Sequence, residues 1–130
     1  MKIRSHEDLE VFQIAYEASM EIYRLTLGFP KVEQYALTDQ IRRASRSVCA
    51  NLAEAFRKRK YPKYFVAKLI DCEGEAAEVQ VWLKYSRNCE YISDENYLSL
   101  TKDMIKFWGN WSLWDKNRRI GCISSDGVKG

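Results

Sequence analysis

The chain has 130 residues, with 46% hydrophobic and 30% charged side chains, six Gly, two Pro and a net charge of +3. This size and composition indicate one globular domain with a single hydrophobic core. So few Gly and Pro argue against a β-sandwich or β-barrel with many turns, and they favour long helices.

Nothing in the sequence indicates export or membrane insertion. The N-terminus, MKIRSHEDLE, has no apolar run after its positive start, whereas a secretory signal needs one. No segment approaches the roughly 20 apolar residues that span a bilayer. We therefore expect a cytoplasmic protein with no membrane contact.

The four cysteines are widely spaced and form no CxxC pair, and the chain has a single histidine, His6. Cys49 and Cys72 lie on or beside apolar stripes, where a cysteine is most often a small buried hydrophobe. A disulfide framework or a zinc site needs closer spacing of its ligands. The sequence predicts no metal and no other cofactor.

A first helix is predicted over residues 6–26. Ser5 and Asp8 have the spacing of a capping box. Gly28 and Pro30 end the helix, because glycine accepts a left-handed cap and proline cannot continue the hydrogen-bond ladder. The residues expected in its buried seam are Leu9, Phe12, Tyr16, Ser19, Tyr23 and Thr26, with Ala15 and Ile22 beside them.

The second helix is predicted from Leu37, or from as early as Val32, to Lys60. Its apolar residues recur every three or four positions, which turns one face of a helix toward a core. This stripe consists of Leu37, Ile41, Ala44, Val48, Leu52 and Phe56. The basic residues off the stripe are Arg42, Arg43 and Arg46, followed by Arg57, Lys58, Arg59 and Lys60.

Two interpretations of these cations stay open. A buried stripe backed by a cationic face is typical of a helix that is turned toward a polyanion. Alternatively, the cations form a solvated face and complement the dipole at the helix C-terminus. From Arg42 to Lys68 there are nine Lys and Arg against one acid, Glu54, so the rest of the chain carries a net charge of −5. This polarised distribution favours one positive face.

The third helix is predicted over residues 62–88. Tyr61 and Pro62 make a tight connection, so the second and third helices should be antiparallel neighbours. Gly74 interrupts the helix and is expected to mark a close approach to another helix. The buried seam has heptad spacing, which is typical of bundle packing. It consists of Phe65, Leu69, Cys72, Ala76, Val79 and Leu83.

Acidic residues share the outer face of the third helix. Asp71, Glu75 and Glu78 could hold a divalent metal, but no histidine accompanies them, and a solvated face is the preferred interpretation. A metal-dependent nuclease that uses Glu73, Glu75 and Glu78 is the corresponding enzyme hypothesis. The chain contains no HExxH sequence, Gly-rich phosphate loop or Ser-His arrangement, so we expect a protein that is not an enzyme.

A fourth helix is predicted from Ser93, a good N-cap, to about Trp114. Trp108, Trp111 and Trp114 span nearly two turns and cannot all face one small core, so we expect them at a subunit interface. Residues 115–130 are expected to form a flexible tail with an accessory basic cluster. Residues 1–114 thus form an all-α, up-down-up-down antiparallel four-helix bundle. The basic residues of the tail are Lys116, Arg118 and Arg119.

Several segments of the chain, taken in order, carry a resemblance to a known family. They are Leu9-x-Val11-Phe12-Gln13, Phe29-Pro30, Leu37-Thr38-x-Gln40-Ile41-Arg42-Arg43-Ala44, Ser47, Asn51-x-Ala53-Glu54, Phe56 and Tyr91-Ile92-Ser93. With this ordered set, the chain resembles small bacterial four-helix-bundle proteins. The family includes proteins encoded in intervening sequences of 23S rRNA genes and the accessory variability determinant of diversity-generating retroelements.

The resemblance implies a homopentameric barrel with a basic surface that binds RNA or DNA, and Arg42 and Arg43 match the family's Arg-Arg pair. In the retroelement branch the pentamer also binds a reverse transcriptase, and the Trp108–Trp114 end of this chain looks more like that branch. Arg46 stands where the family usually has a small apolar residue, which makes this helix more basic than the common pattern.

The most favoured function is therefore a nucleic-acid-binding oligomer, in the form of a reverse transcriptase accessory subunit. The alternatives are an RNA-binding protein encoded in an rRNA intervening sequence and an adaptor that contacts acidic proteins. The residues expected to bind nucleic acid are Arg42, Arg43, Arg46, Arg57, Lys58, Arg59, Lys60, Lys63, Arg118 and Arg119.

Overall fold

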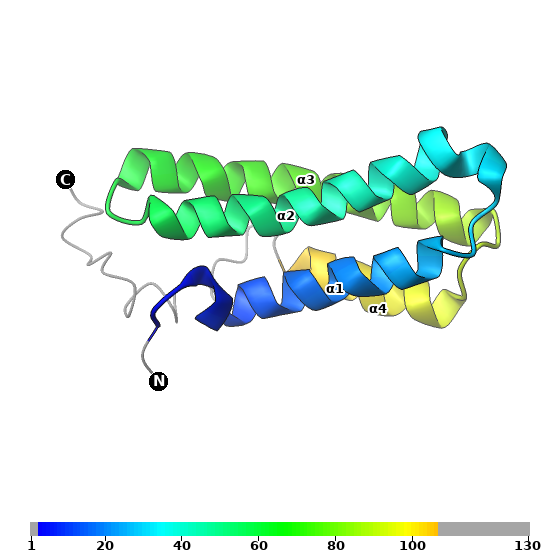
Figure 1. Cartoon of the computed structure of the whole chain (residues 1–130), viewed down its shortest axis with the longest axis horizontal. Coiled ribbons are helices and arrows are strands. Elements are labelled where there is room, and N and C mark those ends of the chain that lie inside the picture. Colours follow the sequence, from blue (N-terminus) through cyan, green and yellow to red (C-terminus); the bar gives the residue numbers. More distant parts are fainter. Residues whose placement is uncertain (1–2, 107–130) are drawn as a thin grey trace.

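The structure, a computed structural model, describes residues 3–106 as an antiparallel four-helix bundle (Figure 1). Each helix packs against the next along the chain, and the fourth returns to the first, so the first and third lie diagonally across the bundle. No strand occurs in residues 3–106, which confirms the all-α prediction. The helices are α1 (Glu10–Thr26), α2 (Asp39–Arg57), α3 (Pro62–Asn88) and α4 (Asp94–Ile105). The predicted end of the fourth helix, to Trp114, and the predicted tail lie outside the described residues.

The start of the first predicted helix is broken. Ser5 and Asp8 do form the capping box, but they cap a short 3₁₀ turn, η1 (His6–Asp8). Leu9 then takes an extended conformation, with φ −75° and ψ 128°, and α1 begins at Glu10. The prediction of one continuous helix was wrong here, because the break turns Leu9 inward, where only 1% of it stays exposed.

The second helix has an irregular approach and an early end. A 3₁₀ turn, η2 (Lys31–Glu33), leads into one stretch of π-helix, η3 (Gln34–Thr38), before α2. The wider π turn holds one more residue per turn, and both Leu37 and Thr38 are buried in it. At the other end α2 stops at Arg57, so the predicted continuation to Lys60 is instead the α2–α3 turn.

The core confirms the predicted stripes of the two central helices. All six predicted residues from Leu37 to Phe56 and all six of α3 are buried, and Val48, Leu52, Cys72 and Val79 have no exposed surface. Burial of each large aliphatic side chain contributes about 1.5–3 kcal/mol to stability. These two stripes pack against each other along α2 and α3, which positions the intervening turn at one end of the bundle.

The predicted seam of α1 was partly wrong. The predicted Ala15, Ser19, Ile22 and Thr26 are buried, together with Val11 and Ala18, whereas the predicted Tyr16 is 49% exposed. Both sets have helical spacing, so the pattern alone does not decide between them. Small alanines on the inner side let α1 approach its neighbours closely, and the large aromatic rings are left on the flank. The predicted seam residues Tyr23 (37% exposed) and Phe12 (partly buried) lie on the same flank.

Gly74 does not mark a close approach within this chain. A Cβ atom placed there would meet nothing within 4 Å in residues 3–106. The prediction of a helix contact at this point was therefore wrong for the bundle itself, although Gly in a helix costs up to about 1 kcal/mol relative to Ala. None of the helices in residues 3–106 combines the length and apolarity of a membrane span.

Candidate nucleic-acid interface

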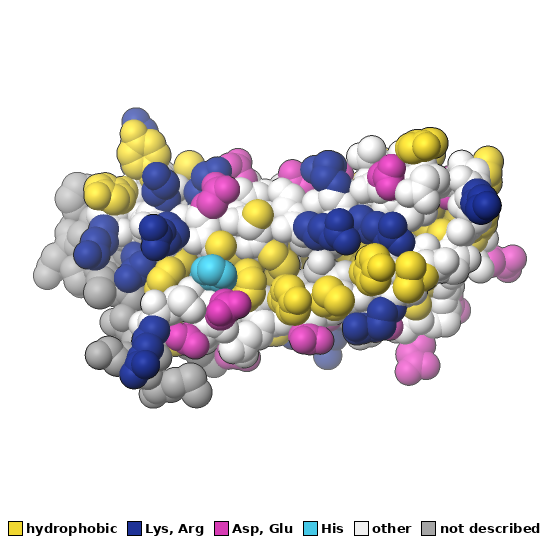
Figure 2. Space-filling model, in the orientation of Figure 1, with side chains coloured by type: hydrophobic (Ala, Val, Ile, Leu, Met, Phe, Trp, Pro, Cys, Tyr) yellow, Lys and Arg dark blue, Asp and Glu magenta, His cyan; other side chains and the backbone are white. Residues whose placement is uncertain are grey.

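Lys and Arg side chains gather over α2 and the α2–α3 turn, and a row of hydrophobic side chains runs beside them along α1 (Figure 2). The predicted binding residues in this region lie close together in the sequence but make different contacts. Arg42 is held against α1, Arg43 is paired with acids of α3, and Arg59 packs on the end of α2. The others are exposed without an ion pair in the described part of the chain. These contacts decide which cations can meet a ligand.

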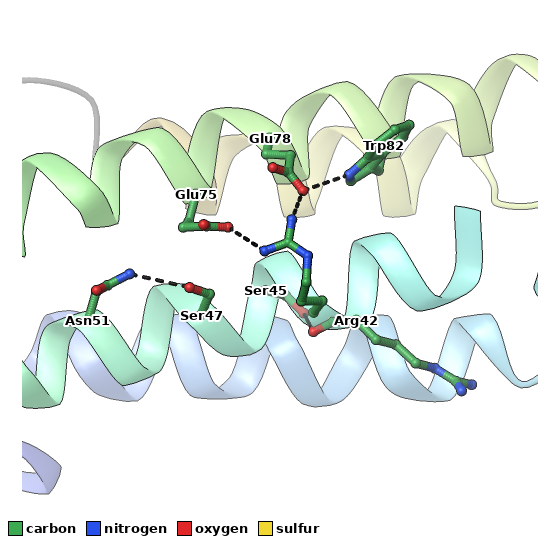
Figure 3. A network of polar contacts seen from close by, with 8 residues as sticks. Arg42, Ser45, Ser47, Asn51, Glu75, Glu78 and Trp82 are labelled. Carbon is green, nitrogen blue, oxygen red and sulfur yellow. Dashed lines mark hydrogen bonds and ion pairs between the residues drawn. The ribbon is translucent and has the colours of Figure 1, made fainter. Parts of the chain in front are cut away.

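Arg42 is held against α1. Its Nε donates a hydrogen bond to Thr26 Oγ1 at 2.8 Å, and its guanidinium lies over the Tyr23 ring at 5.1 Å from the centroid. The side chain points away from α3 (Figure 3). Arg42 therefore joins two helices of the bundle, and its charge borders the aromatic flank of α1.

Arg43 leaves the opposite side of α2 and is paired with two carboxylates of α3. It contacts Glu75 at 3.3 Å and also Glu78, which in turn accepts a hydrogen bond from Trp82 Nε1 at 3.1 Å (Figure 3). Burial lowers the pKa of Arg43, but the hydrogen bond and charge of Glu78, with the charge of Glu75, outweigh it and raise the pKa. The positive charge of Arg43 is thus compensated within the protein.

The acidic face of α3 is therefore not a simple solvated face. Glu75 and Glu78 bind Arg43, and Asp71 lies 3.8 Å from Lys68 Nζ, which also contacts Glu54 at 2.6 Å. In residues 3–106 no three His, Cys, Asp or Glu side chains converge as a metal site would require. The structure offers no support for the metal-dependent nuclease in this region.

Arg59 caps the C-terminal end of α2. Its guanidinium stacks on the Phe56 ring at 4.0 Å, and one of its terminal nitrogens donates to the Phe56 carbonyl at 2.8 Å. Cations near a helix C-terminus complement its dipole, as the second interpretation of the sequence proposed. Arg59 is half-buried and acts mainly as a cap.

The remaining predicted cations are exposed, and none of them makes an ion pair in residues 3–106. Arg46 lies on α2, about 16 Å along the helix axis from Arg57. The others form a compact group at the end of the bundle, which we call the turn cluster. The turn cluster consists of Arg57, Lys58, Lys60 and Lys63.

The N-terminus of α3 adds to the positive potential of the turn cluster. Its first turn contains no acid, Pro62 occupies the start, and no side chain caps the Tyr61 N-cap position. The backbone N–H groups at a helix N-terminus and the helix dipole both favour an anion there. The turn cluster and this helix start together favour phosphate groups over any neutral ligand.

The predicted residues of the C-terminal region, Trp108, Trp111, Trp114, Arg118 and Arg119, lie outside the described residues. The sequence analysis did not identify two exposed apolar faces of the described bundle. One is the aromatic flank of α1, and the other runs along the outer side of α3. A search for a second apolar stripe on each helix would have found both, because each has regular helical spacing.

The thiols of the described residues differ in exposure, which gives a reactivity prediction. Burial raises the pKa of the Cys49 thiol to about 11 and also raises that of Cys72, whereas Cys89 is exposed. In a Cys122→Ser background at pH 8, we expect Cys89 to react rapidly with an aromatic disulfide, because the thiolate is the nucleophile. Cys49 and Cys72 should react only on unfolding. A second fast thiol that disappears in Cys49→Ser would contradict the burial of Cys49.

A family model described as 23S rRNA-intervening sequence protein matches residues 7–108. The chain belongs to this family. The match covers α1 to α4 and confirms the family resemblance that was drawn from the sequence segments. No curated protein matches the chain.

A solved structure supports both the fold and the family. It is a crystal structure of a protein of unknown function from the S23 ribosomal protein family of Bacteroides thetaiotaomicron. The two chains are 27% identical, the match covers 82% of this chain and 96% of that chain, and the TM-score is 0.68. Neither description mentions a retroelement or a reverse transcriptase.

Proposed function

We propose that this member of the 23S rRNA-intervening sequence protein family is a non-enzymatic protein that binds nucleic acid through the turn cluster and Arg46. The single observation that supports this most is the concentration of exposed cations without ion pairs in residues 3–106, beside an uncapped helix N-terminus. Arg43 and Lys68 show that this bundle pairs cations with acids elsewhere. A set of cations that is left unpaired at one end of the molecule is suited to an external polyanion.

The binding should be electrostatic and largely independent of sequence. Lys and Arg side chains on phosphates release condensed counterions, and they position a strand without reading its bases. Three of the four cations in the turn cluster are lysines, whose ammonium groups act as point charges on flexible stems. RNA and DNA are both ligands of this chemistry.

The proposal extends to a homopentamer and to a reverse transcriptase partner, and both extensions rest on the family resemblance. A ring would repeat the turn cluster and let one long polyanion touch several copies, which raises affinity through effective concentration. The neighbouring genes test the partner directly. A reverse transcriptase gene with a template repeat supports the accessory-subunit role, whereas location inside an rRNA gene supports the RNA-binding alternative.

Two matched variants test which arginines of α2 are available to a ligand. Arg46→Met should lower RNA affinity about 5-fold near 0.1 M salt and reduce the salt slope by about 0.7, the value of one phosphate contact. The charge-neutral double variant Arg43→Met with Glu78→Gln should stay within about twofold of wild type, because this pair is already compensated. Fluorescence anisotropy with a labelled RNA measures both. Equal losses in the two variants would mean that the α3 carboxylates do not neutralise Arg43.

A salt titration tests the proposal as a whole. The logarithm of the affinity for RNA should fall linearly with the logarithm of the salt concentration, and the slope counts the phosphates that are contacted. Binding that is absent at low salt would refute nucleic-acid recognition. In that case a pull-down with acidic proteins would examine the adaptor alternative.

A further inference from the structure

Two exposed tyrosine rings lie among the cations of the turn cluster. Tyr61, the last residue before α3, is 59% exposed, and Tyr64, in the first turn of α3, is 62% exposed. At this end of the bundle, Figure 2 shows hydrophobic side chains among the basic ones. A phosphate backbone gains little from an aromatic ring, so this surface carries a second chemistry beside its charge.

Neither ring is engaged by the rest of the bundle. Within residues 3–106, neither packs against another aromatic ring, and neither hydroxyl makes a hydrogen bond. Lys58 Nζ lies over the Tyr64 ring, 6.0 Å from its centroid, which is the outer limit of a cation–π contact. By contrast, the Tyr91 hydroxyl donates a hydrogen bond to Glu33 at 2.8 Å. The rings of Tyr61 and Tyr64 are therefore available to an external ligand.

Exposed aromatic rings between exposed cations have the composition of a single-strand-binding surface. In such surfaces the cations follow the phosphates and the rings stack on successive bases. Stacking tolerates any sequence, because every base has a π-face. The bases of a duplex are paired and stacked on one another, whereas those of a single strand can be splayed out onto a ring. The two tyrosines therefore favour one form of nucleic acid without favouring one sequence.

The start of α3 lies between the two rings in the chain. Tyr61 precedes Pro62 and Lys63, and Tyr64 follows them, in a first turn that contains no acid. The first N–H groups of a helix have no partner within the helix, and no side chain caps this one. A phosphate bound at this helix start would have a ring before it and a ring after it, so that neighbouring nucleotides of one strand can each reach a tyrosine.

We propose that Tyr61 and Tyr64 stack on the bases of a single strand whose phosphates bind the turn cluster. The stacking adds affinity that a duplex cannot gain, so the surface selects single-stranded RNA or DNA. The proposal rests on the proposed function and deepens it, since it names the form of nucleic acid that the site takes. It also divides the affinity into a part that depends on salt, from the cations, and a part that does not, from the rings.

Removal of both rings tests the stacking. The double variant Tyr61→Leu with Tyr64→Leu, which we call the ring-deleted variant, keeps apolar bulk but has no planar ring. It should bind an oligothymidine of about 12 nucleotides at least about 10-fold more weakly than wild type. The slope of log affinity against log salt should stay unchanged, because no phosphate contact is lost. An unchanged affinity would overturn the proposal.

Two controls match this variant. Tyr61→Phe with Tyr64→Phe keeps both rings and should stay within about twofold of wild type, because stacking uses the π-face and not the hydroxyl. Tyr35→Leu removes a ring that is 82% exposed in η3, at the other end of α2, and should also leave the affinity unchanged. Light scattering should give the same mass for wild type and the ring-deleted variant. A change of mass would place the rings against another copy of the chain and overturn the proposal.

An abasic strand separates the bases from the phosphates. A deoxyribose-phosphate strand of the same length has the same charges but nothing to stack, so wild type should bind it at least about 10-fold more weakly than oligothymidine. The ring-deleted variant should bind both strands equally. A 2-aminopurine among the thymidines should lose fluorescence on binding to wild type and keep it with the ring-deleted variant, because stacking on the ring quenches it. A duplex should bind the two proteins with equal affinity.

Failure of the stacking and failure of nucleic-acid binding give different results. If wild type bound the abasic strand as tightly as oligothymidine, with the same salt slope, the stacking would be overturned and the electrostatic function would stand. Equal losses of the ring-deleted variant on both strands would mean that the rings only shape the turn, which would also overturn it. Absence of binding to either strand at low salt would refute nucleic-acid recognition itself, and the stacking with it.

Discussion

Replacing Arg57, Lys58 and Lys60 together with glutamate should lower RNA affinity more than about 100-fold near 0.1 M salt. Each lost phosphate contact removes about 0.7 logarithmic units per decade of salt, so three contacts account for about two orders of magnitude. The new carboxylates add repulsion to that loss. The slope of log affinity against log salt should fall by about 2. These three side chains are exposed and make no ion pair in the described structure, so the fold should persist, and circular dichroism checks it.

The matched control carries the same change of net charge at other exposed positions. Arg24, Lys31 and Lys102 lie on α1, on η2 and on α4, away from the α2–α3 turn. Their joint replacement with glutamate should cost far less affinity, because screening limits the reach of a surface charge to about 10 Å near 0.1 M salt. An equal loss in both triple variants would show that total charge, and not the turn cluster, drives binding.

Ile22→Ala should destabilise the folded protein by about 2–5 kcal/mol. The Ile22 side chain is 1% exposed within the core, so its truncation loses apolar burial and leaves a cavity. Tyr23→Ala, at the next position, should cost about 1 kcal/mol or less, mainly through the lost contact of the ring with the Arg42 guanidinium. Denaturation in guanidinium chloride measures both free energies of unfolding.

This pair of variants separates the two apolar stripes of α1. If Tyr23→Ala were the more damaging change, the aromatic flank of Tyr16 and Tyr23 would be the buried side, and α1 would be rotated relative to the structure. A series of protein concentrations distinguishes the core from subunit contacts, because only the latter make apparent stability depend on concentration.

The sequence predicted the buried stripes of the second and third helices well. On α2 and α3 the predicted inner residues, from Leu37 to Leu83, are buried without exception. On α1 two stripes of similar spacing compete, and only the packing volume beside Ala15 and Ala18 decides which one is inside. The pattern of one helix contains no information about how much room its neighbours leave.

The candidate site was only partly predictable for a related reason. The sequence shows that Arg42, Arg43 and Arg46 are basic, but it does not show which of them has an acid across the helix pair. Glu75 and Glu78 are more than 30 residues from Arg43 along the chain, and the register of α2 against α3 brings them together. The exposed cations of the turn cluster were the predictable part, because the sequence has no acid between Glu54 and Asp71.

The position of the turn cluster also implies a trade-off between stability and activity. The turn joins α2 and α3, the two helices with the most extensive mutual packing, yet it gathers four like charges and places Lys63 at a helix N-terminus, where a cation is unfavourable. Substitutions that remove positive charge from this turn should therefore raise the intrinsic stability of the bundle and lower its affinity for polyanions. A bound polyanion relieves the same repulsion, so occupancy of this surface and resistance to unfolding are thermodynamically linked.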